Sequence, residues 1–196
     1  MTLNPFFPDM KSNIVDSHCH LDFDDFKNDL DNVISNAKLS GVNYMLSISV
    51  DLEKFNKIHR IANKFQNVYC TTGVHPNNVP KKISKNQIEN LKKALKFNLS
   101  KNKVIGIGET GLDFFRNFDN KKNQIDYFET HIDVSGSSQS PLIVHTRAAD
   151  QDTIFYLKKF IPKYKANGLI HCFSSSKTLA ESALDLGFYI SFSGII

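Results

Sequence analysis

The sequence predicts an α/β protein built on a parallel sheet, and two observations carry this prediction. Short apolar or β-branched runs alternate with longer stretches of helical periodicity, an order typical of parallel strands joined by helical crossovers. No glycine-rich or low-complexity linker interrupts the 196 residues, so we expect a single domain over 1–196. Two architectures fit this pattern, an open doubly wound sheet and a (β/α) barrel.

Seven strands are expected, and several of them end in polar residues. They cover 13–20, 43–50, 68–75, 103–109, 141–145, 168–173 and 187–193. A TIM barrel has eight strands and usually about 250 residues. The seventh expected strand almost reaches the last residue, so we expect a TIM barrel that is C-terminally incomplete, with seven of its eight strands in this chain.

Six helices are expected between these strands. They cover 26–40, 52–65, 84–99, 121–134, 153–164 and 177–186. In the first of them, apolar residues follow the i, i+3/i+4 rhythm of one buried stripe: Phe26, Leu30, Val33, Ile34 and Ala37. The run 134–140 is small and polar, so we expect a loop between the fourth helix and the fifth strand.

Composition excludes several classes of protein. Hydrophobic residues make up 41% of the chain and charged residues 22%, as in ordinary globular proteins. No apolar run approaches the roughly 18 residues of a membrane span, and the first residues do not resemble a signal peptide. The three cysteines cannot all pair, which favours a reducing, cytoplasmic location. A net charge of +4 permits an anionic partner without requiring one.

The run DSHCHLD at 16–22 is the first candidate site. Residues two apart on a strand face the same side, so His18 and His20 point together, and Asp16 and Asp22 share their parity. Two neutral imidazoles on one strand are able to share a metal ion. Taken alone, a pair of polar residues at a strand end explains this run equally well.

Four further residues strengthen the metal hypothesis, because each lies at the C-terminal end of an expected strand: His75, Glu109, His145 and His171. In a parallel barrel these ends meet on one face, where active sites form. Five histidines and one carboxylate therefore converge. The remaining histidines, His59 and His131, fall within helices and are expected on the surface. Cys19 and Cys172 have the opposite strand parity to the neighbouring histidines, and we expect both in the core.

Mixed histidine and carboxylate ligands suit divalent ions. A carboxylate such as Glu109 can bridge two ions, and such a pair activates water and clamps the attacking and leaving oxygens of a phosphoryl or acyl centre. The sequence has no glycine-rich phosphate loop after a strand and no feature of a redox cofactor site. Hydrolysis is therefore the expected reaction.

Five motifs, in this order and spacing, resemble the TatD family of metal-dependent deoxyribonucleases, which are amidohydrolase-like TIM barrels. They are VDSHCHLD at 15–22, GVHP at 73–76, IGETGLDF at 107–114, PLIVHTR at 141–147 and HCFS at 171–174. Any one of these motifs is weak evidence. Five in order are highly specific, and the resemblance extends from about residue 13 to the end of the chain.

The resemblance implies two divalent ions per subunit, which would be Mg, Mn or Zn. His18 and His20 would hold the first ion, Glu109 would bridge, and His145 and His171 would hold the second. The family's remaining ligand is an aspartate at the end of the eighth strand. This chain stops before that position, and we assign no substitute for it.

The resemblance also suggests substrate and catalytic roles near the metals. His75 is assigned a catalytic role, as a phosphate contact or general acid; the alternative is a hydrogen bond that caps its own turn. Asp113, Arg116 and Arg147 are assigned to substrate binding. Asp113 alternatively orients a ligand imidazole or a water. Each arginine alternatively forms a buried salt bridge.

The activity that the resemblance implies is 3′-to-5′ exonuclease action on single-stranded DNA, extending to RNA. The basic residues would contact phosphates, and Phe114 or Phe115 would offer a face for stacking on bases, with a place in the core as the alternative for both rings. Two alternatives remain open. Related barrels hydrolyse other substrates with nearly the same ligands, and a chain without an eighth strand would be an inactive metal-binding remnant with exposed sheet edges.

Overall fold

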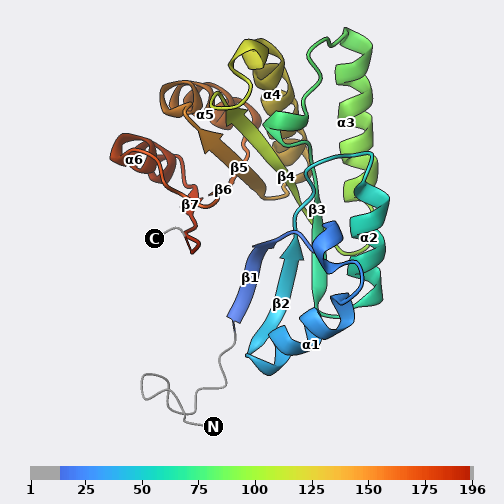
Figure 1. Ribbon diagram of the computed structural model, residues 1–196. Helices are drawn as coiled ribbons and strands as arrows, with labels where there is room; N and C mark the ends of the chain where they lie inside the picture. Colours follow the sequence, from blue (N-terminus) through green and yellow to red (C-terminus); the bar gives the residue numbers. More distant parts are fainter. Residues whose placement is uncertain (1–13, 195–196) are drawn as a thin grey trace.

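In the computed structural model, which describes residues 14–194, seven parallel strands form one curved sheet in the order β1-β2-β3-β4-β5-β6-β7 (Figure 1). The strands are β1 (Ile14–Cys19), β2 (Val42–Ser47), β3 (Val68–Thr72), β4 (Val104–Asp113), β5 (Leu142–Arg147), β6 (Gly168–Ile170) and β7 (Tyr189–Ile190). This strictly sequential order excludes the doubly wound sheet, in which the strand order reverses. The α/β barrel prediction with seven strands is therefore confirmed.

Six helices line the outer side of the curved sheet (Figure 1). They are α1 (Leu30–Leu39), α2 (Phe55–Lys64), α3 (Lys85–Leu99), α4 (Lys121–Ser138), α5 (Asp150–Tyr164) and α6 (Lys177–Asp185). Short 3-10 turns at Asp24–Phe26, Pro76–Asn78 and Phe118–Asn120 lie in the loops that follow β1, β3 and β4. In the described residues, no helix is long and apolar enough to cross a membrane.

The core lies between the helices and the sheet, in two clusters. The larger joins α3 to α6 with β4 to β6 and includes the fully buried Phe128 and Leu157. The smaller lies under α1 and α2 and includes Met45 and Ile58. At about 25 cal/mol per Å² of buried apolar surface, such packing is the main force that holds the strand ends in place.

The first helix starts later than its apolar stripe predicts. Phe26 lies in the 3-10 turn, and α1 begins at Leu30. Within the stripe, Ile34 is buried, while Leu30 and Ala37 are partly buried and pack against the smaller cluster. Periodicity thus indicated the buried face correctly and the first turn incorrectly.

The expected loop at 134–140 is wrong, because α4 continues to Ser138 and ends with Gln139 in the left-handed conformation. The small residues have a packing role. A Cβ at Gly136 would collide with the carbonyl of Tyr164, so glycine allows the end of α5 to approach α4 closely. The hydroxyl groups of Ser137 and Ser138 donate to the carbonyl of Val134 within the helix, at 3.1 and 2.6 Å.

The surface position expected for His131 is also wrong, because the side chain is fully buried. Its Nδ1 donates to the carbonyl of Tyr127 at 2.7 Å, and its Nε2 accepts from the amide of Val74 at 3.1 Å. These two bonds fix a neutral imidazole, and burial lowers its pKa to about 4. His59, by contrast, is partly exposed on α2, as expected.

Candidate metal centre

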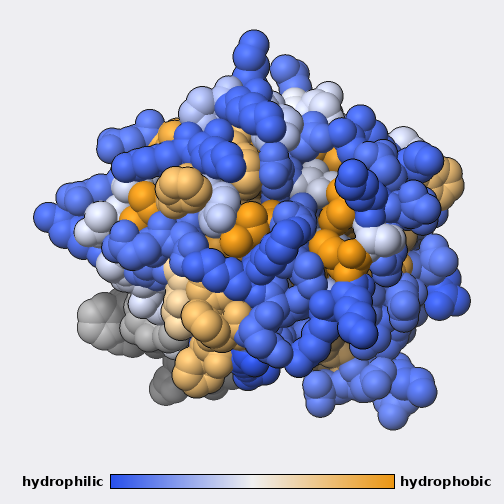
Figure 2. Space-filling view, turned by 90° about the horizontal axis from the view of Figure 1, so that it is seen from above, coloured by the Kyte–Doolittle hydropathy of each residue, from blue (hydrophilic) through white to orange (hydrophobic). Residues whose placement is uncertain are grey.

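The C-terminal ends of the strands meet on one face, the upper face in Figure 1, and Figure 2 looks directly onto it. Hydrophobic residues lie among many hydrophilic ones on this face. The strand ends bring together the side chains of Glu109, His18, His75, His145 and His171. The expected convergence on Glu109 is therefore present for four of the five histidines, and His20 is the exception.

Glu109 lies within β4 and points inward because the strand is irregular there. The β4–β5 register shifts between Ile107 and Thr110. Gly108 has φ +125°, which is strained for other residues, and its missing Cβ would lie 2.6 Å from the carbonyl of Ile143. The amide of Glu109 donates across the interior to the carbonyl of Ser49 at 2.8 Å.

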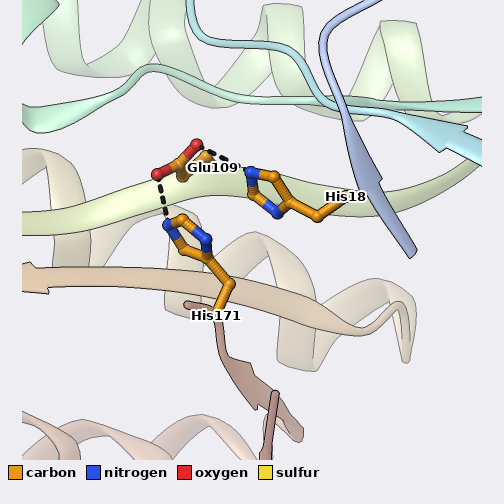
Figure 3. Close-up of side chains that lie close together, drawn as sticks. All are labelled: His18, Glu109 and His171. Carbon is orange, nitrogen blue, oxygen red and sulfur yellow. Dashed lines mark ion pairs between the residues drawn. The ribbon is translucent and has the colours of Figure 1, made fainter. Parts of the chain in front are cut away.

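Glu109 is 3% exposed and is surrounded by four imidazoles. Its Oε1 lies 2.5 Å from His171 Nε2, 3.0 Å from His145 Nδ1 and 3.6 Å from His75 Nε2. Its Oε2 lies 3.4 Å from His18 Nε2 (Figure 3). Burial raises the pKa of Glu109, but the neighbouring imidazoles of His145, His171 and His18 outweigh it and hold the pKa well below its ordinary value. The carboxylate is thus ionised, as a metal ligand must be.

His18 and His171 face Glu109 together. Their rings stack with centroids 4.0 Å apart and an interplanar angle of 6°, and both point at the carboxylate (Figure 3). Both nitrogens of His18 are buried without a hydrogen-bond partner. Buried polar atoms without partners are rare and costly, so this imidazole is suited to a ligand that its protein neighbours do not supply.

Two groups of three ligand atoms lie close enough together to hold an ion, with all atoms of a group within 4.8 Å of one another. They are His18, Glu109 and His171, and His75, Glu109 and His145. Glu109 belongs to both, as a bridging carboxylate would. The pairing differs from the one that the resemblance implies, since His18 groups with His171 and His145 groups with His75.

His20 lies outside both groups. β1 ends at Cys19, so the alternation of a strand no longer sets the direction of the next side chain. The rings of His18 and His20 are nearly perpendicular, at 82°. His20 stacks on Phe23, and its Nδ1 contacts the carbonyl of Ile48 at 3.2 Å. Since the carbonyl only accepts, Nδ1 is the donor, and Nε2 keeps the lone pair that a metal requires.

Asp113 orients His145. Its Oδ2 lies 3.3 Å from His145 Nε2 and accepts from Asn77 Nδ2 at 3.1 Å, while Oδ1 accepts from the amides of Phe115 and Arg116. The residue is 1% exposed. Burial raises the pKa of Asp113, but the bonds from the Arg116 amide and Asn77 outweigh it and lower the pKa. With both oxygens occupied by protein donors, Asp113 fits the orienting role better than substrate contact.

The ring of His75 is fixed by a hydrogen bond to its Nδ1, whereas Asp113 contacts Nε2 of His145. Its Nδ1 accepts from the amide of Asn77 at 3.0 Å, which is the turn-capping bond named as the alternative. The proton of the neutral ring therefore lies on Nε2, which faces Glu109. Burial lowers the pKa of His75 to about 4, although Glu109 opposes this shift. The ring presents an N–H group to the site.

Both candidate arginines lie on the surface beside the mouth. Arg116 and Arg147 are exposed, and in residues 14–194 neither pairs with a carboxylate. The alternative of buried salt bridges is therefore wrong. The guanidinium of Arg147 lies over the ring of Phe115, with Cζ 4.1 Å from the centroid.

The cysteines are not metal ligands in this arrangement. Cys19 donates to the carbonyl of Leu46, and burial, followed by Asp16 and Asp22, raises its pKa to about 12. Cys172 is outside the two core clusters and is partly exposed, with Sγ 2.8 Å from Ser193 Oγ. Cys19 therefore packs against the smaller core cluster, close to the position expected for it, whereas Cys172 lies outside the core.

A pocket of about 430 Å³ opens beside the site, between the sheet edges β1 and β7. His18, His20, His171 and Cys172 contribute to its wall. In the described part of the chain, neither β1 nor β7 has a strand on its outer side. The exposed edges expected for a seven-stranded sheet are therefore present.

Sequence reasoning missed Ser49 and Asn77, which hold Glu109 and Asp113 in place. Ser49 lies two residues after the end of β2, so the rule that located the histidines at strand ends applies to it as well. Asn77 follows the GVHP motif in a turn, where no periodicity indicates its direction. Its role is visible only in three dimensions.

The donor set fits divalent metal ions: an ionised buried carboxylate, four imidazoles around it, and two buried nitrogens of His18 that have no hydrogen-bond partner. The mode of binding differs between the rings. With the ring proton of His145 on Nε2, where Asp113 accepts it, Nδ1 is able to bind a metal ion beside Glu109, whereas His75 turns an N–H toward Glu109. His145 is thus the better metal ligand of the two.

Comparisons with known proteins agree with this site. Residues 15–196 match the family described as TatD related DNase. An uncharacterized metal-dependent hydrolase of Buchnera aphidicola subsp. Baizongia pistaciae is 39% identical over 186 residues, which cover 93% of this chain and 68% of that protein. The "3'-5' ssDNA/RNA exonuclease TatD" of Klebsiella pneumoniae is 28% identical over 169 residues, covering 86% of this chain and 62% of the relative.

A solved structure shares the fold. The TatD homologue YjjV of Escherichia coli superimposes with a TM-score of 0.80 at 28% identity, covering 92% of this chain and 68% of the other. The chain thus spans about two thirds of the length of these relatives. With the matched family region and the clustered histidine and glutamate side chains, these findings show that the chain belongs to the TatD family of metal-dependent hydrolases.

Proposed function

We propose that this protein hydrolyses phosphodiester bonds of single-stranded DNA from the 3′ end, with RNA as a second substrate, in a cytoplasmic location. One observation carries the proposal: a buried Glu109 shared by two groups of imidazoles. A shared carboxylate suits two divalent ions, and Mn or Zn suits these nitrogen-rich ligands better than Mg. The name of the Klebsiella relative supports this substrate class.

His18, Glu109, His145 and His171 would hold the ions, and His20 would add a ligand through its Nε2. When bound, divalent ions activate water and neutralise charge on a phosphoryl group. The protein contributes the rigid placement of its ligands. Asp113 directs the lone pair of His145 inward, and the stacked rings of His18 and His171 hold each other in register.

We assign His75 to phosphate binding rather than to proton transfer. Its pKa of about 4 keeps the ring neutral near pH 7, so it has no extra proton to give to a leaving group. Its Nε2–H points into the site and is able to donate to a phosphate oxygen. Exposed Arg116 would contact a phosphate further along the strand.

The test is release of the labelled nucleotide from a 3′-labelled single-stranded DNA in the presence of Mn²⁺, with a matched RNA alongside. Glu109→Gln keeps the size of the side chain and removes its charge, so we expect loss of both metal binding and release. Asp119→Asn, an exposed carboxylate change outside the site, is the control. Metal-bound wild-type protein that releases nothing from either strand would reject the proposal and direct attention to amide or ester substrates.

A further inference from the structure

We propose that Phe115, backed by Arg147, forms a stacking platform for an unpaired nucleobase of the substrate strand. The inference rests on the proposed nuclease function and names how the strand is recognised. It assigns Arg147 a different role from the phosphate contact expected from the sequence, because its guanidinium lies over the aromatic ring of Phe115, with Cζ 4.1 Å from the centroid.

The first step is the exposure of the pair. The ring of Phe115 is 66% exposed although it is large and apolar, and Arg147 is exposed as well. A cation over an aromatic ring is attracted by the negative face of the ring. In residues 14–194, Arg147 has no carboxylate partner to draw it away from the ring. The pair therefore presents a flat, positively charged surface to solvent.

The second step is its rigid connection to the metal centre. The amide of Phe115 donates to Asp113 Oδ1 at 3.0 Å, and Asp113 pairs in register with Arg147 across the β4–β5 ladder. The other oxygen of Asp113 contacts His145, which contacts Glu109. The end of β4 and the neighbouring β5 thus hold both the platform and the metal ligand His145. A base held on Phe115 therefore has a defined position relative to the site.

The third step is the chemistry of the occupant. Nucleobases stack on aromatic rings and on guanidinium planes, and each such contact contributes about 1–3 kcal/mol to single-strand binding. Other exposed rings also follow strand ends on this face: Phe23 after β1, Phe118 after β4 and Phe192 after β7. A single-stranded chain offers one base per nucleotide to such rings. A base within a duplex is already stacked and paired, so the platform favours unpaired ends.

The chain contains a matched control pair. Phe97 on α3 is 65% exposed and has the Lys101 ammonium 4.8 Å from its ring centroid. It lies close to the loop that leads into the start of β4, which places it at the opposite end of the sheet from Phe115. Phe97→Ala therefore removes an equally exposed ring with a cation over it, but away from the mouth.

The experiment measures binding of fluorescent single-stranded DNA by anisotropy, in metal-free wild-type protein and again in the Glu109→Gln background. Phe115→Ala should weaken binding by roughly 5- to 150-fold, the range that one lost stacking contact implies. Phe115→Trp should retain the affinity, Arg147→Ala should lose part of it, and Phe97→Ala should leave it unchanged.

A second series replaces one of the last four nucleotides at a time by an abasic residue. In protein with Phe115, one abasic position should weaken binding as much as Phe115→Ala does; in Phe115→Ala, that position should cost nothing further. Equal abasic penalties in both proteins would overturn the platform. If metal-loaded protein still releases nucleotides in that case, the nuclease proposal survives; if no strand is bound or cleaved, both are rejected.

Discussion

Asp113 Oδ2 and His145 Nε2 lie 3.3 Å apart, and this contact decides which nitrogen of His145 faces Glu109. Both nitrogens of His145 face carboxylates, and a neutral ring carries one proton. With that proton on Nε2, where Asp113 accepts it, Nδ1 turns its lone pair toward Glu109. His145 Nδ1 is 3.0 Å from Glu109 Oε1, and two acceptors at that distance repel unless a proton or a cation lies between them. The pair is thus arranged to bind a positive ion.

Asp113→Asn should reverse this arrangement. The amides of Phe115 and Arg116 both require an acceptor at Oδ1, so the new NH₂ group would occupy the Oδ2 position and face His145. The imidazole would then turn an N–H toward Glu109. We expect a loss of about 10- to 100-fold in metal affinity, measured by calorimetry. Asp119→Asn should bind metal normally, and unchanged affinity in Asp113→Asn would contradict the orienting role.

His75→Ala and His145→Ala should separate the two kinds of histidine. Because His75 presents an N–H and His145 a lone pair, His75→Ala should keep its metal and lose roughly 10²-fold in kcat. His145→Ala should lose metal itself. The measurement is metal content after gel filtration, together with steady-state kinetics. Metal loss of the same size in both variants would show that His75 is a ligand.

Much of the site could be predicted from the sequence, because parallel strands place their C-terminal ends on one face. That rule alone brings Glu109 together with His145 and His171. The same rule overextends at His20, where the strand has already ended and alternation no longer applies. Strand ends are the least regular part of the pattern, and a shift of one residue changes the direction of a side chain.

Other features depend on packing between distant segments, which periodicity does not encode. The composition of Gly136 and its neighbouring serines predicts a loop, yet these residues belong to α4. The small residue is needed there because the end of α5 packs directly against Gly136. His131 reads as a surface histidine because charged residues flank it. Its partner, the amide of Val74, is 57 residues away in the chain.

Arg116→Ala should affect substrate binding without affecting metal. Arg116 is exposed and has no carboxylate partner in the described residues, so its removal leaves no buried charge. We expect KM to rise more than kcat falls, and the salt dependence of DNA binding to decrease by about one unit of slope. The measurement is KM and affinity over a range of salt concentrations. An unchanged salt slope would remove Arg116 from the phosphate contacts.

His131 should make stability depend on pH. Its folded pKa, about 4, lies below the ordinary value of 6.5, so between these values the unfolded chain binds more protons than the folded one. Stability therefore rises as pH increases from 4 to 6.5 and gains nothing from this residue above that window. The full contribution is on the order of 3 kcal/mol, since one pKa unit corresponds to about 1.4 kcal/mol.

The check is chemical denaturation at pH 4.5 and pH 7 for wild type, His131→Gln and His59→Gln. Other groups titrate in the same range, so the informative quantity is the difference between proteins. Glutamine does not titrate, and His131→Gln should therefore lose less stability than wild type on acidification. His59→Gln changes a partly exposed ring and should follow wild type. Equal losses of stability in all three proteins would show that His131 does not control the acid response, because a buried histidine with a lowered pKa must make wild type more sensitive to acid than His131→Gln.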